Sequence, residues 1–223
     1  MSEATTPTTT PTTTPTATPT ASSSGQARYQ VRFDWGVSGA HRILPGAHVA
    51  VLVDALLFTT HVVVAAENGD DSPASGVAAA ALDVEVAERG LVVLAGSLRN
   101  RAAVADRVLA LQEERGERVV VAVIAAGEPA DGGRGIRFAI EDQLTAGAVV
   151  DALVALGLDH TSPEAAVASA AYEGLQHAAV HLIGASGSGA ELVAAGRKPE
   201  VRLATERDVT RVVPELRDGV FRA

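Results

Sequence analysis

Three runs of this chain are apolar at every position, and they constrain its fold more than any other feature. They lie at 49–53, 91–95 and 119–125, and valine is their commonest residue. A strand with one face in water alternates apolar and polar residues, so an unbroken run indicates a strand covered on both faces. Such strands are typical of a parallel or mixed sheet that lies between layers of helices.

Segments with helical periodicity follow these runs. In 98–115 small and aliphatic residues share one face, and Gly116 supplies a stop. A second pattern at 138–156 repeats apolar residues every four positions, and a third helix is predicted from Ser162, an N-cap before proline, to about Ile183. The alternation predicts an α/β fold: a layered sandwich with a parallel or mixed sheet covered by helices.

The chain divides into a low-complexity start and one domain. Residues 5–24 are almost entirely Thr, Pro, Ala and Ser, which offer too little apolar surface to offset the entropy of ordering. We expect residues 1–26 to form a disordered Thr/Pro-rich tail and residues 27–223 a single domain, which is long enough to bury a core. The domain is predicted to open with a half-exposed strand at 29–33, where apolar and polar residues alternate.

Charge and residue usage exclude several classes of function. The formal net charge is −9, and the 18 Lys and Arg residues are scattered without a basic stripe, which disfavours nucleic acid as a partner. The chain has no cysteine, which excludes disulfides, thiolate nucleophiles and cysteine-held metal clusters. Without a signal-like segment or a bilayer-length apolar run, we expect a cytoplasmic protein with no membrane partner.

Acidic residues follow two of the predicted strands. In open α/β sheets the ligand site lies beyond the carboxyl ends of the strands; Asp54 directly follows the first apolar run, and Glu141 and Asp142 start the helix after the third. Hard oxygen ligands of this kind suit Mg²⁺, and we expect the three carboxylates to face one cleft. Two simpler interpretations stay open: Asp54 caps the next helix, and the acidic pair only complements a helix dipole on a solvated face.

A glycine-rich segment, GASGSG at 184–189, precedes a short helix predicted at 190–195. Its backbone N–H groups could hold an anion, and a flexible helix start is the alternative. The segment lacks the lysine of a Walker loop, and Ser188 stands where a nucleophile elbow around Ser186 needs glycine. His177 and His181 have i, i+4 spacing, but no third ligand is near them, which disfavours a shared metal.

Several further segments are informative through their order and spacing along the chain. They are VRFDWG at 31–36, VLVDALLFTT at 51–60, AGSLRN at 95–100, IAAG at 124–127, IED at 140–142, AG at 146–147, and LVAAG at 192–196 leading to Asp208 and Val213-Pro214. Together they resemble the 2-phosphosulfolactate phosphatases over nearly the whole ordered part. The resemblance implies a Mg²⁺-dependent phosphatase that converts 2-phosphosulfolactate to sulfolactate and phosphate, a step toward coenzyme M.

The resemblance also implies roles for single residues. Asp54 and Asn100 are expected to be catalytic, and Glu141 and Asp142 to hold Mg²⁺. The expected substrate-binding residues are Thr59 and Thr60 from the family motif and Ser186 and Gly187 from the glycine-rich segment. The ligand is then a small phosphorylated acid, and the chain could also form a homo-oligomer.

The sequence departs from the family pattern in two places. Leu57 stands where relatives usually have a polar residue. Between Gly69 and Ser72 some tens of residues are missing, including Gly-Glu-Arg and Phe-Asp-Leu-Gly-Asn-Ser-Pro segments, and 72–82 resembles a Thr-Asn-Gly-Thr stretch that has lost its Asn. We expect a wider cleft beside Asp54 and slow turnover at best, because a site that lacks donors stabilises the transition state less.

Two other functions are weighed against the phosphatase. The first is a catalytically degenerate relative that binds an anionic metabolite or serves as a subunit. The second, a haloacid-dehalogenase-type phosphatase, is disfavoured because Leu56 stands where its Asp-x-Asp motif needs an acid.

Overall fold

The computed structural model describes residues 26–75, 90–130 and 135–223. In this part a seven-stranded sheet has the order β1-β5-β2-β4-β8-β9-β3. Its first four strands are parallel: β1 (Val31–Trp35), β5 (Val121–Ala125), β2 (Val49–Val53) and β4 (Val92–Gly96). The other three extend it with antiparallel pairings: β8 (Glu215–Arg217), β9 (Val220–Arg222) and β3 (Ser72–Pro73). A separate ladder joins β6 (Glu128–Pro129) to β7 (Ile136–Arg137).

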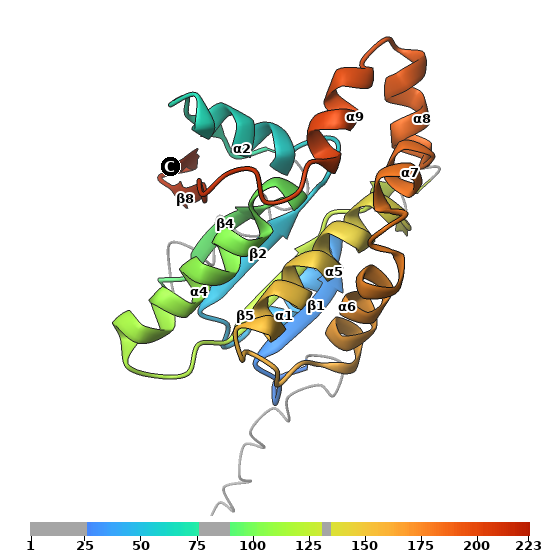
Figure 1. The fold of residues 1–223 in the computed structure, drawn as a ribbon. Coiled ribbons are helices and arrows are strands. Elements are labelled where there is room, and N and C mark those ends of the chain that lie inside the picture. Colours follow the sequence, from blue (N-terminus) through green and yellow to red (C-terminus); the bar gives the residue numbers. More distant parts are fainter. Residues whose placement is uncertain (1–25, 76–89, 131–134) are drawn as a thin grey trace, which may run out of the picture.

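Helices cover both faces of the parallel strands (Figure 1). One face carries α1 (Gly36–Ile43) and α2 (Thr59–Glu67), and the other carries α4 (Arg101–Arg115), α5 (Ile140–Ala155) and α6 (Pro163–Leu175). A 3₁₀ turn, η2 (Leu98–Asn100), leads into α4, and Gly116 ends α4 in a left-handed conformation as predicted. The predicted α/β sandwich with a mixed sheet is thereby confirmed.

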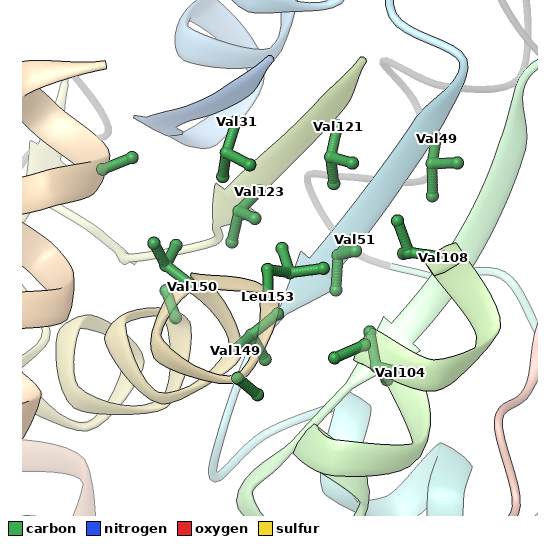
Figure 2. Close-up of a cluster of buried hydrophobic side chains, with 14 of the residues drawn as sticks. Val31, Val49, Val51, Val104, Val108, Val121, Val123, Val149, Val150 and Leu153 are labelled. Atoms are coloured by element: carbon green, nitrogen blue, oxygen red, sulfur yellow. The ribbon is translucent and has the colours of Figure 1, made fainter. Parts of the chain in front are cut away.

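The apolar runs are unbroken because both faces of each central strand are buried. Val49 and Val51 of β2 point into a cluster with α4 and α5 (Figure 2). Ala50 and Leu52, which alternate with them, belong to the cluster under α1 and α2. Each such valine or leucine contributes about 1.5–3 kcal/mol on burial, so the sheet and its two helical layers stabilise each other.

The first strand differs from its prediction. It spans Val31–Trp35, and its predicted half-exposure is wrong because Arg32 and its neighbours are buried. Arg32 can be buried because its guanidinium donates hydrogen bonds to the carbonyl oxygens of Ile43 and Pro45, both at 2.8 Å. A polar residue in an alternating pattern is therefore not always a residue in water.

The predicted long helix from Ser162 to Ile183 is also wrong, because it is broken in two. Ser162 caps α6 as expected, and its Oγ accepts a hydrogen bond from Ala165 N at 3.1 Å. The chain then turns at 176–178 and continues as α7 (Ala179–Gly184). The break lets α7 bury Ala179 and Ile183 in a third cluster with α5, α8 (Gly187–Ala194) and α9 (Lys198–Thr205). Helix α8 begins three residues before its predicted start.

Residues 1–25, which make up most of the expected tail, lie outside the described residues. Gln26, assigned to the tail, belongs to the folded domain: its side chain donates to Phe33 O at 2.9 Å and accepts from Phe33 N at 3.1 Å. In the part of the chain that the structure describes, no helix is long and apolar enough to cross a membrane.

Candidate active site

Asp142 joins the carboxyl ends of two neighbouring strands. It lies in the first turn of α5, and its Oδ1 accepts a hydrogen bond from Ala55 N, just beyond β2, at 2.7 Å. Its Oδ2 accepts one from Gly127 N, just beyond β5, at 2.9 Å. Because β2 and β5 are adjacent and parallel, one carboxylate satisfies backbone groups of both, and Asp142 is only 3% exposed.

Asp54 sits in the tight turn that leads from β2 to α2. Its Oδ1 accepts a hydrogen bond from Leu57 N at 3.0 Å. The N-cap position of α2 is Phe58, and no side chain caps this helix, so the interpretation of Asp54 as the helix cap is wrong. Asp54 instead closes the turn and lies beside the acids of α5.

Glu141, one position before Asp142 in α5, completes the acidic cluster. It is 3% exposed, so the alternative that the acidic pair lies on a solvated face is wrong. Its Oε1 accepts a hydrogen bond from Ser188 Oγ at 2.6 Å, which brings the start of α8 to the cluster. We call Asp54, Glu141 and Asp142 the acid cluster.

Burial and repulsion from neighbouring acids disfavour negative charge on Asp54 and Asp142. Burial is the larger cause, and with the charge of Glu141 it raises the pKa of Asp54 to about 6, against opposing hydrogen bonds from backbone N–H groups. Burial and the charge of Asp54 raise the pKa of Asp142 well above its usual range. A cation at this point would relieve both costs.

The remaining predicted residues mostly use their polar groups within the protein. The Asn100 side chain accepts from Ser97 N and Ser97 Oγ and donates to the carbonyl oxygens of Ala95 and Val212, so its amide is fully occupied. Thr59 Oγ1 exchanges two hydrogen bonds with the backbone of Asp54. Ser97, Asn100 and Thr59 are all buried, and the structure gives them a role in holding the loops at the strand ends.

Thr60 is the exception among the predicted hydroxyls. It is 2% exposed, and its Oγ1 has no hydrogen-bond partner among the described residues. A buried hydroxyl without a partner costs free energy, which makes Thr60 a candidate donor to a ligand.

The glycine-rich segment begins a helix rather than forming an open loop. Ser186 Oγ accepts from Gly189 N at 3.0 Å and donates to Ile183 O at 2.8 Å, so it caps α8. A Cβ on Gly187 would lie 2.9 Å from Arg137 Nη1, so the guanidinium packs directly on this glycine. Arg137 also forms an ion pair with Glu128.

A hollow of about 310 Å³ lies beside the acid cluster. Leu57 and Ser188 line it, and these residues bond Asp54 and Glu141 respectively. Glu128 and Arg197 also line it. Sequence reasoning did not assign these four residues to the site; the glycine-rich sequence between Glu128 and Arg137 was the available signal for the pairing of β6 with β7.

The family model of 2-phosphosulpholactate phosphatase matches residues 78–219, which is more than half of the 223-residue chain. The chain belongs to this family. A search of curated proteins found no match.

The matched region contains part of the acid cluster of this family member. Glu141, Asp142 and Ser188 lie inside it, whereas Asp54 and Thr60 precede it. The hydrogen bond from Ala55 N to Asp142 Oδ1 connects the two parts. The turn after β2 is therefore tied to the matched region by structure as well as by the resemblance of its sequence.

The predicted shortening falls at the end of α2. There Gly69 adopts a left-handed conformation with a φ of 82°, and the chain enters β3, which pairs with β9. The stretch at 72–82 continues beyond the described residues, and the wider cleft expected from the shortening stays a prediction.

The donors of the acid cluster suit a hard cation such as Mg²⁺. Oε1 of Glu128, at the edge of the hollow, is buried without a hydrogen-bond partner among the described residues. The side chains by themselves do not form a complete set of metal ligands: in the described ranges no group of three His, Cys, Asp or Glu residues is placed to hold a metal ion. Asp142 accepts hydrogen bonds at both carboxylate oxygens, whereas Asp54 accepts one at Oδ1 from Leu57 N and Glu141 accepts one at Oε1 from Ser188 Oγ.

Proposed function

We propose that this family member is a Mg²⁺-dependent phosphatase that hydrolyses 2-phosphosulfolactate, or a similar small phosphorylated hydroxy acid, to the hydroxy acid and phosphate. The observation that carries the proposal is the acid cluster at the carboxyl ends of β2 and β5, with a hollow beside it. Family membership names the reaction class. The buried carboxylates supply the place where a cation and a phosphate ester would meet.

Each residue of the site then has a defined part. Glu141 and Asp54 would hold Mg²⁺, which neutralises charge on the phosphoryl oxygens when bound. Asp142 keeps the ends of β2 and β5 at a fixed separation through its two backbone bonds. Ser188 orients the Glu141 carboxylate. Thr60 is not among the residues that line the hollow, and its Oγ1 is buried, so its expected role in substrate binding stays a prediction.

The alternative function, an inactive relative that binds an anionic metabolite, is favoured by one observation. The polar side-chain groups of Asn100, Thr59 and Ser186 form hydrogen bonds within the protein, in two loops and a helix cap. Few side-chain donors then remain to stabilise charge in a transition state. Such a protein would bind the ester or its product and release no phosphate.

Phosphate release from 2-phosphosulfolactate, measured with Mg²⁺ and with EDTA, separates the two functions. We expect Mg²⁺-dependent release that Glu141→Gln reduces by about 10²-fold or more. Asp159→Asn is the matched control, because Asp159 is an exposed acid in the loop after α5. This loop lies at the amino end of β1, whereas the acid cluster lies at the carboxyl ends of the strands. Absence of Mg²⁺-dependent release from the purified wild-type protein would refute the phosphatase and leave the binding function.

A further inference from the structure

We propose that the Thr/Pro-rich segment at 5–24 binds in an aromatic groove beside β1, so that the start of the chain covers a surface of its own domain. The inference concerns an interaction surface and is independent of the proposed phosphatase activity. The groove shares no lining residue with the hollow beside the acid cluster.

The groove lies between the end of β1 and the N-terminal ends of α5 and α6. Its volume is about 380 Å³, within the range of about 300–1,000 Å³ that is usual for ligand sites. One wall is apolar and open to solvent, because Val167 of α6 is 67% exposed. We call this space the β1 groove; its lining includes Phe33, Trp35, Gln143, Pro163, Glu164 and Val167.

Aromatic side chains, which are rare in this chain, gather at the β1 groove. The chain has one Trp, two Tyr and four Phe. The Trp35 ring lies edge to face with Phe33, with centroids 5.7 Å apart, and lies 5.3 Å from the ring of Phe138. Phe138 adjoins the groove and is 58% exposed. Grooves lined by aromatic rings are a recurring binding site for proline-rich segments in the polyproline II conformation.

The start of this chain has the composition that such a groove accepts. Prolines recur every four residues at 7, 11, 15 and 19, and no charged residue occurs in 5–24. A neutral occupant suits a groove lined by Glu164 better than an acidic one would. The polyproline II helix has about three residues per turn, so prolines spaced by four do not share one face. One or two prolines would therefore enter the groove at a time.

This interpretation agrees with the composition of the segment, which has too little apolar surface to fold alone. A polyproline II segment has no internal hydrogen bonds and needs no core of its own. It is also a stiff conformer, so it loses little entropy when it binds a groove that already exists.

The fold anchors the end of the segment next to the β1 groove. Gln26, the first described residue, bonds both backbone groups of Phe33: its Nε2 lies 2.9 Å from Phe33 O and its Oε1 3.1 Å from Phe33 N. Phe33 lines the groove. The stretch from Pro19 to Gln26 spans up to about 25 Å when extended, so the prolines can reach the groove. The tether gives the segment an effective concentration on the order of mM, which favours it over a separate protein in dilute solution.

Trp35 reports whether the groove is occupied, because it is the only tryptophan of the chain and it lines the groove. In the full chain, replacing all four prolines of the segment with alanine is expected to increase acrylamide quenching of Trp35 fluorescence about 2-fold, as the segment leaves the groove. The matched control replaces the threonine before each proline with serine and should be quenched as the wild type is. Equal quenching of all three proteins would refute the inference.

Val167→Asp changes the groove instead of the segment. Val167 is exposed, so the fold should persist, and a carboxylate on the apolar wall should increase quenching as the four-proline variant does. In the four-proline variant the same substitution should add no further quenching. Val180→Asp is the matched control: Val180 is 62% exposed on α7 and is not among the lining residues. Increased quenching in both single variants, or in neither, would contradict binding in the β1 groove.

A peptide and a dilution series identify the occupant. A peptide with the sequence of residues 12–20 should protect Trp35 of the four-proline variant with a half-point at or below the mM range, and the same peptide with alanine for both prolines should not. Quenching of the wild type should be constant from about 1 to 100 μM protein, because binding within one chain does not depend on concentration. Loss of protection on dilution would show that a second copy supplies the segment, and the inference of binding within one chain would be wrong.

Discussion

Single polar residues at the strand ends of this protein affect its stability as well as its candidate site. Asp54 is held by a backbone N–H group, yet burial and the neighbouring acid raise its pKa to about 6 from an ordinary value of 3.8. The folded state therefore prefers the protonated form of this side chain. Its contribution to stability is fully present below about pH 4 and is lost as the pH rises through about 6.

We accordingly predict that, in EDTA, the free energy of unfolding falls as the pH rises from 4 to 8, and that Asp54→Asn flattens this decline. The part due to Asp54 is at most about 3 kcal/mol, because each pKa unit is worth about 1.4 kcal/mol. Urea unfolding at a series of pH values measures it. Asp159→Asn should keep the wild-type slope, and an equally steep decline in Asp54→Asn would contradict the assignment.

Asn100 offers a second prediction at the residue scale. Its amide is fully buried and bonded to Ser97, Ala95 and Val212. Asn100→Ala should cost about 2–4 kcal/mol, because it leaves several buried backbone groups without partners. Thermal unfolding measures the loss, with Asn68→Ala as the control, since Asn68 is exposed and makes one bond to Val64 O. A normal melting temperature combined with lost activity would instead support the catalytic role expected from the family resemblance.

At the scale of elements, the close packing of α5 against α6 fixes the position of the acids at the start of α5. The two helices lie close together at Gly147, where an added Cβ would lie 2.2 Å from the carbonyl oxygen of Ala168. Backbone atoms cannot move aside as a flexible side chain can. The glycine therefore sets the spacing of the two helices.

Gly147→Ala is predicted to destabilise the fold by about 1–3 kcal/mol, the usual cost of overpacking. Gly174→Ala is the matched control in α6, since an added Cβ there meets no atom within 4 Å. That substitution should be neutral or stabilising by up to about 1 kcal/mol, because alanine favours helix. Equal melting temperatures for the two variants would show that α5 and α6 can separate without cost.

At the scale of the whole molecule, the C-terminal hairpin completes the sheet next to the site. Strand β8 pairs with β4, and β9 pairs with β3. Phe221 of β9 is 1% exposed and stacks edge to face on Phe58, with ring centroids 5.9 Å apart. Phe58 directly precedes α2 and follows the turn of Asp54, so the C-terminal hairpin packs against the segment that carries Asp54.

Phe221→Ala should therefore cost about 3–5 kcal/mol and lower the affinity of the site for its ligand. Phe138→Ala is the control, because Phe138 is 58% exposed, and it should cost less than about 1 kcal/mol. Chemical denaturation gives both values. If Phe221→Ala lowers the free energy of unfolding no more than Phe138→Ala does, the C-terminal hairpin contributes little to the stability of the fold.

The local pattern of the chain determined the central architecture. The unbroken apolar runs at 49–53, 91–95 and 119–125 indicated strands buried on both faces, and the structure places β2, β4 and β5 within or close to them. Capping residues such as Ser162 and Gly116 set helix ends through bonds within a few residues. The position of Asp54 and Glu141 after these strands also followed, because the carboxyl ends of parallel strands share one edge.

Only the tertiary structure decided how the polar groups are used. Asp142 bonds a residue 87 positions away, Ser188 reaches Glu141 across 47, and Asn100 reaches Val212 across 112. Periodicity reports which face of an element is buried, but not which distant donor meets a given acceptor. Those partners depend on the path of the whole chain, so the sequence could not show that the Asn100 amide bonds Val212, and the catalytic role implied by the family resemblance stays a prediction.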